Sequence, residues 1–210
     1  PPGAGTALWS EQIGDPALPL VLLIHGSMDR SAGMLKLSRR LDHQCSVVRY
    51  DRRGYGRSRP HHGPFDMGAQ VADALSMLAG RRAVIFGHSY GGNVALAVAA
   101  AVPEQVAGVA VYETPLSWEP WWPGSTAGAA AVAAANEPER ASEGFMRRMI
   151  GDERWQALPE RTRQARRAEG VAMVAELADL RLHRPWEAAR ITLPVLAGFG
   201  SRGAAHHRTG

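Results

Sequence analysis

The stretch Gly87-His88-Ser89-Tyr90-Gly91-Gly92 decides how this sequence is interpreted. An apolar run over 83–86 leads directly into it, and a helical pattern over 93–101 follows it. So tight a turn from strand to helix leaves no room for side chains at the flanking glycines, and it strains the backbone at Ser89 while raising the hydroxyl above the sheet edge. The N–H groups at the start of the next helix face the same point. We therefore predict a serine nucleophile, with the Tyr90 N–H donating to a developing oxyanion.

Outward from this turn, apolar runs alternate with helical patterns, which is typical of a parallel sheet flanked by helices. Five runs are short, apolar and rich in β-branched residues, as strands buried on both faces should be. They are 20–25, 46–50, 83–86, 106–112 and 193–197, with a weaker edge strand over 8–13. Helices are predicted over 33–41, 67–79 and 90–101. The predicted fold class is therefore α/β, with a mostly parallel central sheet.

The alternation stops between 114 and 190, where no strand pattern occurs. Three tryptophans stand close together at its start, and an alanine-rich run and two helical patterns, near 145–150 and over 161–182, follow them. A long helical excursion between two parallel strands lies over one end of the sheet. We therefore predict a helical cap inserted after the strand that ends near Tyr112. The predicted domains are a core, 1–113 with 191–210, and a cap, 114–190.

Composition and charge narrow the possible partners. The chain has 210 residues, of which 45% are hydrophobic and 21% charged, as in a globular protein with one sizeable core. Its net charge of +4 resides mainly on scattered arginines and favours no nucleic-acid partner. No apolar run approaches the roughly 18 residues of a membrane span, and the N-terminal residues lack the pattern of a signal peptide. A single cysteine, Cys45, leaves no internal disulfide and favours the cytoplasm.

Two further segments carry a family resemblance. Residues 20–27, Leu-Val-Leu-Leu-Ile-His-Gly-Ser, resemble the strand and His-Gly loop of the α/β-hydrolase superfamily. Residues 51–58, Asp-Arg-Arg-Gly-Tyr-Gly-Arg-Ser, resemble the loop that follows the next strand in that family. Together with the turn at 87–92, the resemblance covers nearly the whole chain, and 114–190 is its least specific part.

The resemblance implies roles for the residues of these loops. A second donor to the oxyanion would be the backbone N–H of Ser27, or of Met28 next to it. His25 and Asp51 would have structural rather than catalytic roles. Candidates for the wall of a substrate pocket are Met28, Trp118 and Trp122, with Trp121 beside them, because a helical insertion after the strand at 106–112 lies over the C-terminal edge of the sheet. The open alternative is that the tryptophans only pin the cap to the core.

A serine at the nucleophile position implies acyl transfer through an ester intermediate. Haloalkane dehalogenases and epoxide hydrolases of this superfamily have Asp there, so the resemblance favours neither. The leading hypothesis is a hydrolase of a small ester, thioester, lactone or amide, a monomer or homodimer that needs no cofactor or metal. An acyltransferase and a cofactor-free haloperoxidase use the same parts. The alternative from another class is a receptor-like member that binds a ligand without turnover.

The family order is nucleophile, then acid, then histidine. The acid most often follows the strand that corresponds to 193–197, but Gly203 stands at about that place. In some relatives the acid instead ends the strand after the nucleophile, and here Glu113 directly follows 106–112. We therefore predict Glu113 as the acid that orients the histidine. The open alternative is a structural residue that anchors the cap.

Three histidines follow Glu113: His183, His206 and His207. His183 falls in the predicted cap, where a surface or packing role is expected. In relatives the catalytic histidine follows one more helix and one more strand after the usual acid loop. We therefore expect it beyond residue 210, in a chain that is truncated at its C-terminus. Should the base lie within the chain, His206 and His207 are the first to test.

Overall fold

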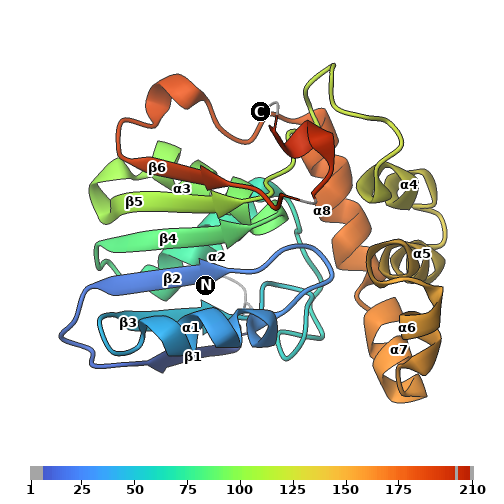
Figure 1. Ribbon diagram of the computed structural model, residues 1–210, viewed down its shortest axis with the longest axis horizontal. Coiled ribbons are helices and arrows are strands. Elements are labelled where there is room, and N and C mark those ends of the chain that lie inside the picture. The colour runs from blue at the N-terminus through green and yellow to red at the C-terminus, as the bar shows by residue number, and fades with distance from the viewer. Residues whose placement is uncertain (1–6, 202, 209–210) are drawn as a thin grey trace.

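A computed structural model describes residues 7–201 and 203–208, and six strands within them form one sheet in the order β1-β3-β2-β4-β5-β6 (Figure 1). Their bounds are β1 Ser10–Ile13, β2 Leu20–Ile24, β3 Ser46–Tyr50, β4 Ala83–His88, β5 Val106–Tyr112 and β6 Val195–Gly198. β1 runs antiparallel to β3, and the other four neighbouring pairs are parallel. The predicted α/β fold with a mostly parallel sheet is confirmed, and the weak edge strand is β1.

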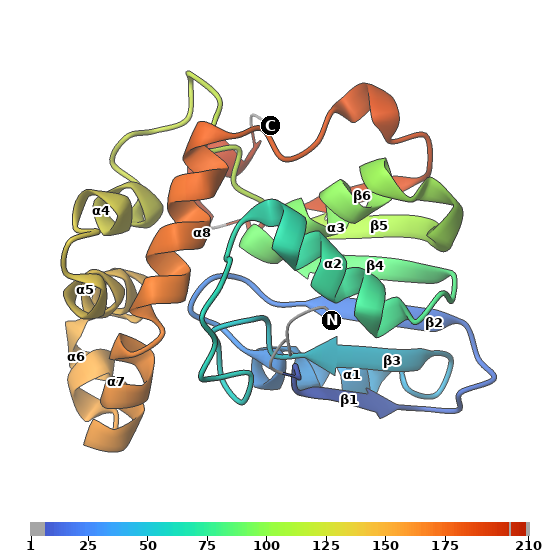
Figure 2. The same cartoon turned by 180° about the vertical axis from the view of Figure 1, so that it is seen from behind.

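Helices cover both faces of this sheet. α1 (Leu35–Leu41) lies on one face, and α2 (Met67–Leu78) and α3 (Tyr90–Ala101) lie on the other, as Figures 1 and 2 show from opposite sides. Alternate side chains of β2 pack on the two faces of the sheet, because successive residues of a strand point in opposite directions. Leu22 and Ile24 join the large core beneath α2 and α3, whereas Val21 and Leu23 join the smaller cluster beneath α1.

A helical segment, residues 127–182, stands beyond the C-terminal ends of the parallel strands (Figure 1). It comprises α4 Ala127–Ala133, α5 Pro138–Ile150, α6 Asp152–Ala157, α7 Glu160–Arg167 and α8 Gly170–Leu182. Short 3-10 turns occur elsewhere, at η1 Ser31–Met34, η2 Pro103–Gln105, η3 Ala188–Arg190 and η4 Ala205–Arg208. As predicted, no strand occurs between 114 and 190, all of which the structure describes. None of the described helices is long and apolar enough to cross a membrane.

The helix predicted over 161–182 is two helices, α7 and α8, and the reason lies at their junction. Glu169 stands there with its side chain fully buried among arginines. The following residue, Gly170, begins α8 so close to α5 that a Cβ would lie 2.0 Å from the carbonyl oxygen of Pro138. Close packing between helices therefore interrupts a pattern that is helical on both sides.

β4 extends two residues further than its apolar run predicts. Gly87 and His88 remain in the sheet because they pair with Val111 and Tyr112 of β5. The strand therefore ends at the residue before Ser89, and this places Ser89 at the C-terminal edge of the sheet.

Candidate active site

The turn at residues 87–92, called the elbow below, forces Ser89 into an unusual backbone conformation. Its φ is 52° and its ψ is −124°, which few residues with a side chain adopt. The Ser89 N–H donates to the Tyr112 carbonyl at 2.9 Å and ties the turn to β5. A Cβ at Gly87 would lie 2.2 Å from the Gly91 carbonyl oxygen, and one at Gly91 would lie 2.3 Å from that of Ile24. Close backbone contacts therefore require both glycines.

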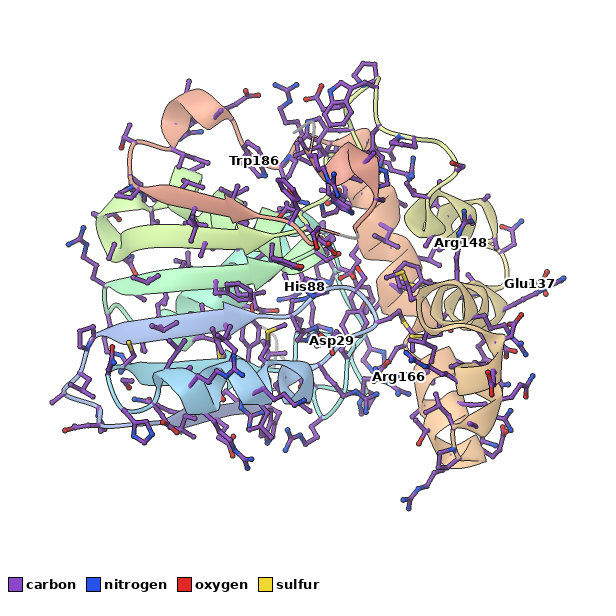
Figure 3. All side chains as sticks on the ribbon, viewed as in Figure 1. Asp29, His88, Glu137, Arg148, Arg166 and Trp186 are labelled. Atoms are coloured by element: carbon purple, nitrogen blue, oxygen red, sulfur yellow. The ribbon has the colours of Figure 1, made fainter. Side chains whose placement is uncertain are left out.

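Ser89 opens into a cavity of about 530 Å³ between the sheet edge and the helical segment. Figure 3 labels one residue on each side of this cavity: His88 at the end of β4, next to Ser89, and Arg148 on the facing α5. The polar lining includes Ser27, Glu113, Arg148, Arg181, His206 and His207. The apolar lining includes Trp122, Phe145, Met149 and Leu177. The site thus combines a serine, a carboxylate, two imidazoles and two guanidinium groups around an apolar wall.

The His-Gly loop, residues 25–28, passes directly beside the nucleophile. A Cβ at Gly26 would lie 2.9 Å from the Cβ of Ser89. The Ser27 hydroxyl donates to Glu176 Oε1 at 2.6 Å. Within the described part of the chain, the backbone N–H groups of Ser27 and Tyr90 donate to no carbonyl group. Both N–H groups are therefore unpaired with the backbone carbonyls that the structure describes in this region of the fold.

His25 is fixed by hydrogen bonds at both ring nitrogens. Its Nδ1 lies 2.8 Å from the Gly26 carbonyl oxygen, and its Nε2 accepts from the Arg52 N–H at 2.9 Å. Complete burial, reinforced by the Arg52 charge, lowers the pKa of His25 well below its usual value. His25 is therefore neutral and shapes the loop, and it has no free nitrogen with which to act as a base.

Asp51 has a similar place in the neighbouring loop. It accepts from the backbone N–H groups of Ser31 at 2.8 Å and Arg57 at 2.9 Å. Burial opposes its ionisation, but these hydrogen bonds outweigh burial and lower the pKa of Asp51. Gly56 is required here, because a Cβ would lie 2.4 Å from the Asp51 carboxylate. Asp51 thus closes a loop and does not line the cavity.

Glu113 reaches across to the loop that follows β6. Its backbone has a φ of 51°, and its N–H donates to the Gly198 carbonyl at 2.9 Å. Its Oε1 accepts from the Gly200 N–H at 3.1 Å. A Cβ at Gly203 would lie only 2.6 Å from this oxygen. The carboxylate of Glu113 therefore occupies the space beside Gly203, the position where most relatives have their acid.

His206 and His207 line the same cavity as Ser89 and Glu113. Their rings stack edge-on against Trp122, with centroids at 4.5 and 5.4 Å. Burial lowers the pKa of His207 and the neighbouring His206 adds to this, whereas the charge of Glu113 opposes it. Among the described residues, no hydrogen bond joins either imidazole to Ser89.

The remaining predicted residues lie at different distances from the cavity. Trp122 lines it, whereas Trp118 packs edge-on against Trp186 with centroids 5.6 Å apart. Trp121 is 43% exposed, and Met28 is buried in the core. Neither Met28 nor Trp118 belongs to the described lining of the cavity. Exposed His183 at the end of α8 contacts Asp179 at 2.7 Å.

One residue of the site that the sequence analysis missed is Glu176. It lies on α8, is fully buried and contacts Ser27, Arg52 and Tyr55. A glutamate in the apolar run Gly-Val-Ala-Met-Val-Ala-Glu-Leu-Ala is the signal that could have indicated it, since a buried acid needs partners. The described residues include no cluster of His, Cys, Asp or Glu that could hold a metal ion.

Comparisons with known proteins identify the family and the fold. Residues 21–207 match the alpha/beta hydrolase family. A 91-residue stretch, 42% of this chain, is 34% identical to an uncharacterised protein of Mycobacterium tuberculosis and spans only 27% of that protein. An alpha/beta hydrolase from Sphaerobacter thermophilus is 28% identical with a TM-score of 0.65, over 96% of this chain and 81% of its own. A thermophilic esterase from Thermogutta terrifontis is 25% identical with a TM-score of 0.69, over 92% and 74%.

Proposed function

This chain belongs to the alpha/beta hydrolase family, as its motifs predicted, and from that premise we propose that it is a serine hydrolase with Ser89 as nucleophile. The observation that carries the proposal is the strained Ser89 at the mouth of a cavity, between the available N–H groups of Ser27 and Tyr90. Such an arrangement suits acyl transfer, because negative charge develops on the carbonyl oxygen during attack. The proposed substrates are small esters, thioesters, lactones or amides.

In the proposed reaction the Ser89 oxygen attacks the acyl carbon and loses its proton to a histidine. The carbonyl oxygen becomes an oxyanion that accepts from the Ser27 and Tyr90 N–H groups. The tetrahedral intermediate then collapses, the leaving group takes the proton from the histidine, and an acyl ester on Ser89 remains. Water, activated by the same histidine, hydrolyses this ester and restores the serine.

Glu113 is the proposed partner of that histidine. A carboxylate at the end of β5, one strand away from the nucleophile, is well placed to orient an imidazole and to stabilise its charged form. The histidine itself has to approach both Ser89 and Glu113. Among the described residues His207 is the candidate, because it lines the same cavity as Ser89 and the charge of Glu113 raises its pKa against the effect of burial.

The cavity lining indicates which acyl groups it favours. Trp122, Phe145 and Leu177 provide an apolar wall, and two arginines, Arg148 and Arg181, stand beside it. Arg148 donates to the Ser125 carbonyl oxygen and Arg181 to the Thr126 hydroxyl, and neither has a carboxylate partner among the described residues. We therefore propose that the preferred acyl group combines an apolar segment with a terminal carboxylate, which pairs with the guanidinium groups.

The test is labelling of the protein with a fluorophosphonate, which forms a covalent bond to an activated serine. Wild type should be labelled at Ser89 and should hydrolyse p-nitrophenyl esters, whereas Ser89→Ala should do neither, since a nucleophile cannot be replaced within a triad. Ser117→Ala is the control, because Ser117 lines the same cavity outside the elbow. Labelling at another serine, or full turnover by Ser89→Ala, would refute the assignment.

A ligand-binding protein without turnover is the second candidate. It is favoured by the lack of a hydrogen bond between Ser89 and either imidazole in the described part of the chain. Such a protein would bind carboxylated ligands yet neither label nor hydrolyse. The labelling experiment therefore separates the two functions directly.

A further inference from the structure

A fully buried carboxylate lies behind the candidate active site, on the helical segment rather than on the sheet. Glu176 of α8 accepts from Arg52 at 2.6 and 3.1 Å and from the Tyr55 hydroxyl at 2.6 Å. Burial alone would lower the pKa of Arg52, but the facing Glu176 outweighs this and raises it. Glu176 and Arg52 are therefore a charged pair in the buried interior, where their mutual attraction holds both side chains firmly in place.

The third partner of this carboxylate belongs to the His-Gly loop. The Ser27 hydroxyl donates to Glu176 Oε1 at 2.6 Å, across 149 positions of sequence. A second contact from the helical segment reaches the next residue, since Arg166 of α7 donates to the Met28 carbonyl at 3.1 Å (Figure 3). The loop beside Ser89 is thus held through its side chain and its backbone by helices that precede β6 in the chain.

We propose that Glu176 is a positioning residue, which acts through the Ser27 hydroxyl to hold the Ser27 backbone N–H toward the oxyanion. This inference rests on the proposed function of Ser89 and Ser27. The hydroxyl is committed to Glu176 and the N–H is not committed to any backbone carbonyl in the described chain. Because Glu176 holds the Ser27 side chain, the backbone N–H of Ser27 is oriented before the substrate arrives. Preorganised donors of this kind stabilise the transition state rather than the bound substrate.

Removing the link should therefore lower kcat and leave KM nearly unchanged. Complete loss of one oxyanion donor costs about 10²–10³-fold in kcat. Ser27→Ala keeps the backbone N–H and removes only the hydrogen bond that orients it, so we expect a loss of about 10-fold to 100-fold.

Ser27→Ala is the decisive variant because Glu176→Gln also strands the buried charge of Arg52 and can prevent folding. In Ser27→Ala, Glu176 keeps its three bonds from Arg52 and Tyr55. The matched control is Ser58→Ala, which removes another 2.6 Å hydrogen bond from a buried serine, donated to the Asp51 carbonyl; neither Ser58 nor Asp51 belongs to the described cavity lining. Measurements are kcat and KM for p-nitrophenyl esters, the rate of fluorophosphonate labelling, and Tm.

A lower kcat and slower labelling in Ser27→Ala, with KM kept and with Ser58→Ala like wild type, is the expected result. Equal activity in wild type and Ser27→Ala overturns the positioning role while leaving the serine-hydrolase function intact. Equal losses in both alanine variants also overturn it, because they indicate a general loss of stability. A wild type that neither labels nor hydrolyses refutes the proposed function, and the positioning role falls with it.

Discussion

The elbow and the His-Gly loop face each other across Ser89, yet they are held in entirely different ways. The elbow is fixed by backbone contacts within a few residues of the chain and its neighbouring strands, which is why Gly87 and Gly91 have no side chains. The His-Gly loop is fixed by a carboxylate on a distant helix, through the Ser27 hydroxyl. One half of the site depends on steric fit and the other on charge and hydrogen bonding. Mutations in the two halves should therefore fail for different reasons.

The largest effect is expected at the elbow, from Gly91→Ala. Its Cβ would lie 2.3 Å from the Ile24 carbonyl oxygen and 2.6 Å from that of His25, and backbone cannot yield as a flexible side chain does. We expect esterase activity and labelling to fall below detection, with a lower Tm. Gly144→Ala is the control, because no atom lies within 4 Å of its Cβ in α5. Retained activity in Gly91→Ala would show that the elbow does not depend on steric fit.

Glu113→Gln should give the next largest effect. The change keeps the size of the side chain but removes the charge that stabilises an imidazolium, and kcat should fall by about 10³–10⁴-fold with little change in Tm. The exposed Glu104→Gln is the control and should match wild type. Near-normal kcat in Glu113→Gln would mean that Glu113 only anchors the loop after β6, as its bond to Gly200 allows.

A smaller effect, restricted to one substrate class, is expected from Arg181→Gln. This residue is outside both the elbow and the His-Gly loop, so it should affect selectivity rather than the chemical step. We expect kcat/KM to fall about 10-fold for a p-nitrophenyl ester with a terminal carboxylate and to stay unchanged for a neutral ester. Arg184→Gln, which loses an ion pair with Glu119 outside the cavity lining, should change neither. Equal losses for both esters would contradict a carboxylate site.

The smallest effect concerns pH and the His-Gly loop. Because burial lowers the pKa of His25, the unfolded chain binds a proton that the folded chain does not, and stability is lost as pH falls below about 6.5. At pH 5.5 the loss from this residue should be about 1.4 kcal/mol. Urea unfolding of wild type and His25→Asn across pH 8 to 5.5 should show a shallower slope in the variant. The exposed His43→Asn should keep the wild-type slope, and identical slopes in all three would show that His25 does not titrate in this way.

The difference between the elbow and the His-Gly loop also explains which parts of the fold and of the site the sequence predicted. The five main strands, the helices that flank the sheet and the elbow follow from local apolar patterns and from glycines whose contacts lie close by. The break between α7 and α8 did not, because it results from Gly170 packing on Pro138 across the helical segment. Glu176 was missed for the same reason, since its partners Ser27, Arg52 and Tyr55 are far away in sequence. The sequence placed Trp118 and Trp122 together in the predicted pocket wall, and only the packing separates them, since Trp122 lines the cavity and Trp118 packs against Trp186.

The second buried carboxylate of the helical segment has a consequence for motion. Glu169, one residue before α8, pairs with Arg30 at 2.8 Å and accepts from the Gly56 N–H at 3.0 Å, so it and Glu176 fasten α8 to the core at two points, two turns apart. Lifting α8 would separate both carboxylates from Arg30, Arg52 and the Gly56 N–H, so these contacts would have to break together. We therefore expect α8 to move with the sheet as one body, and any opening of the cavity to involve α4 and α5, which also line it.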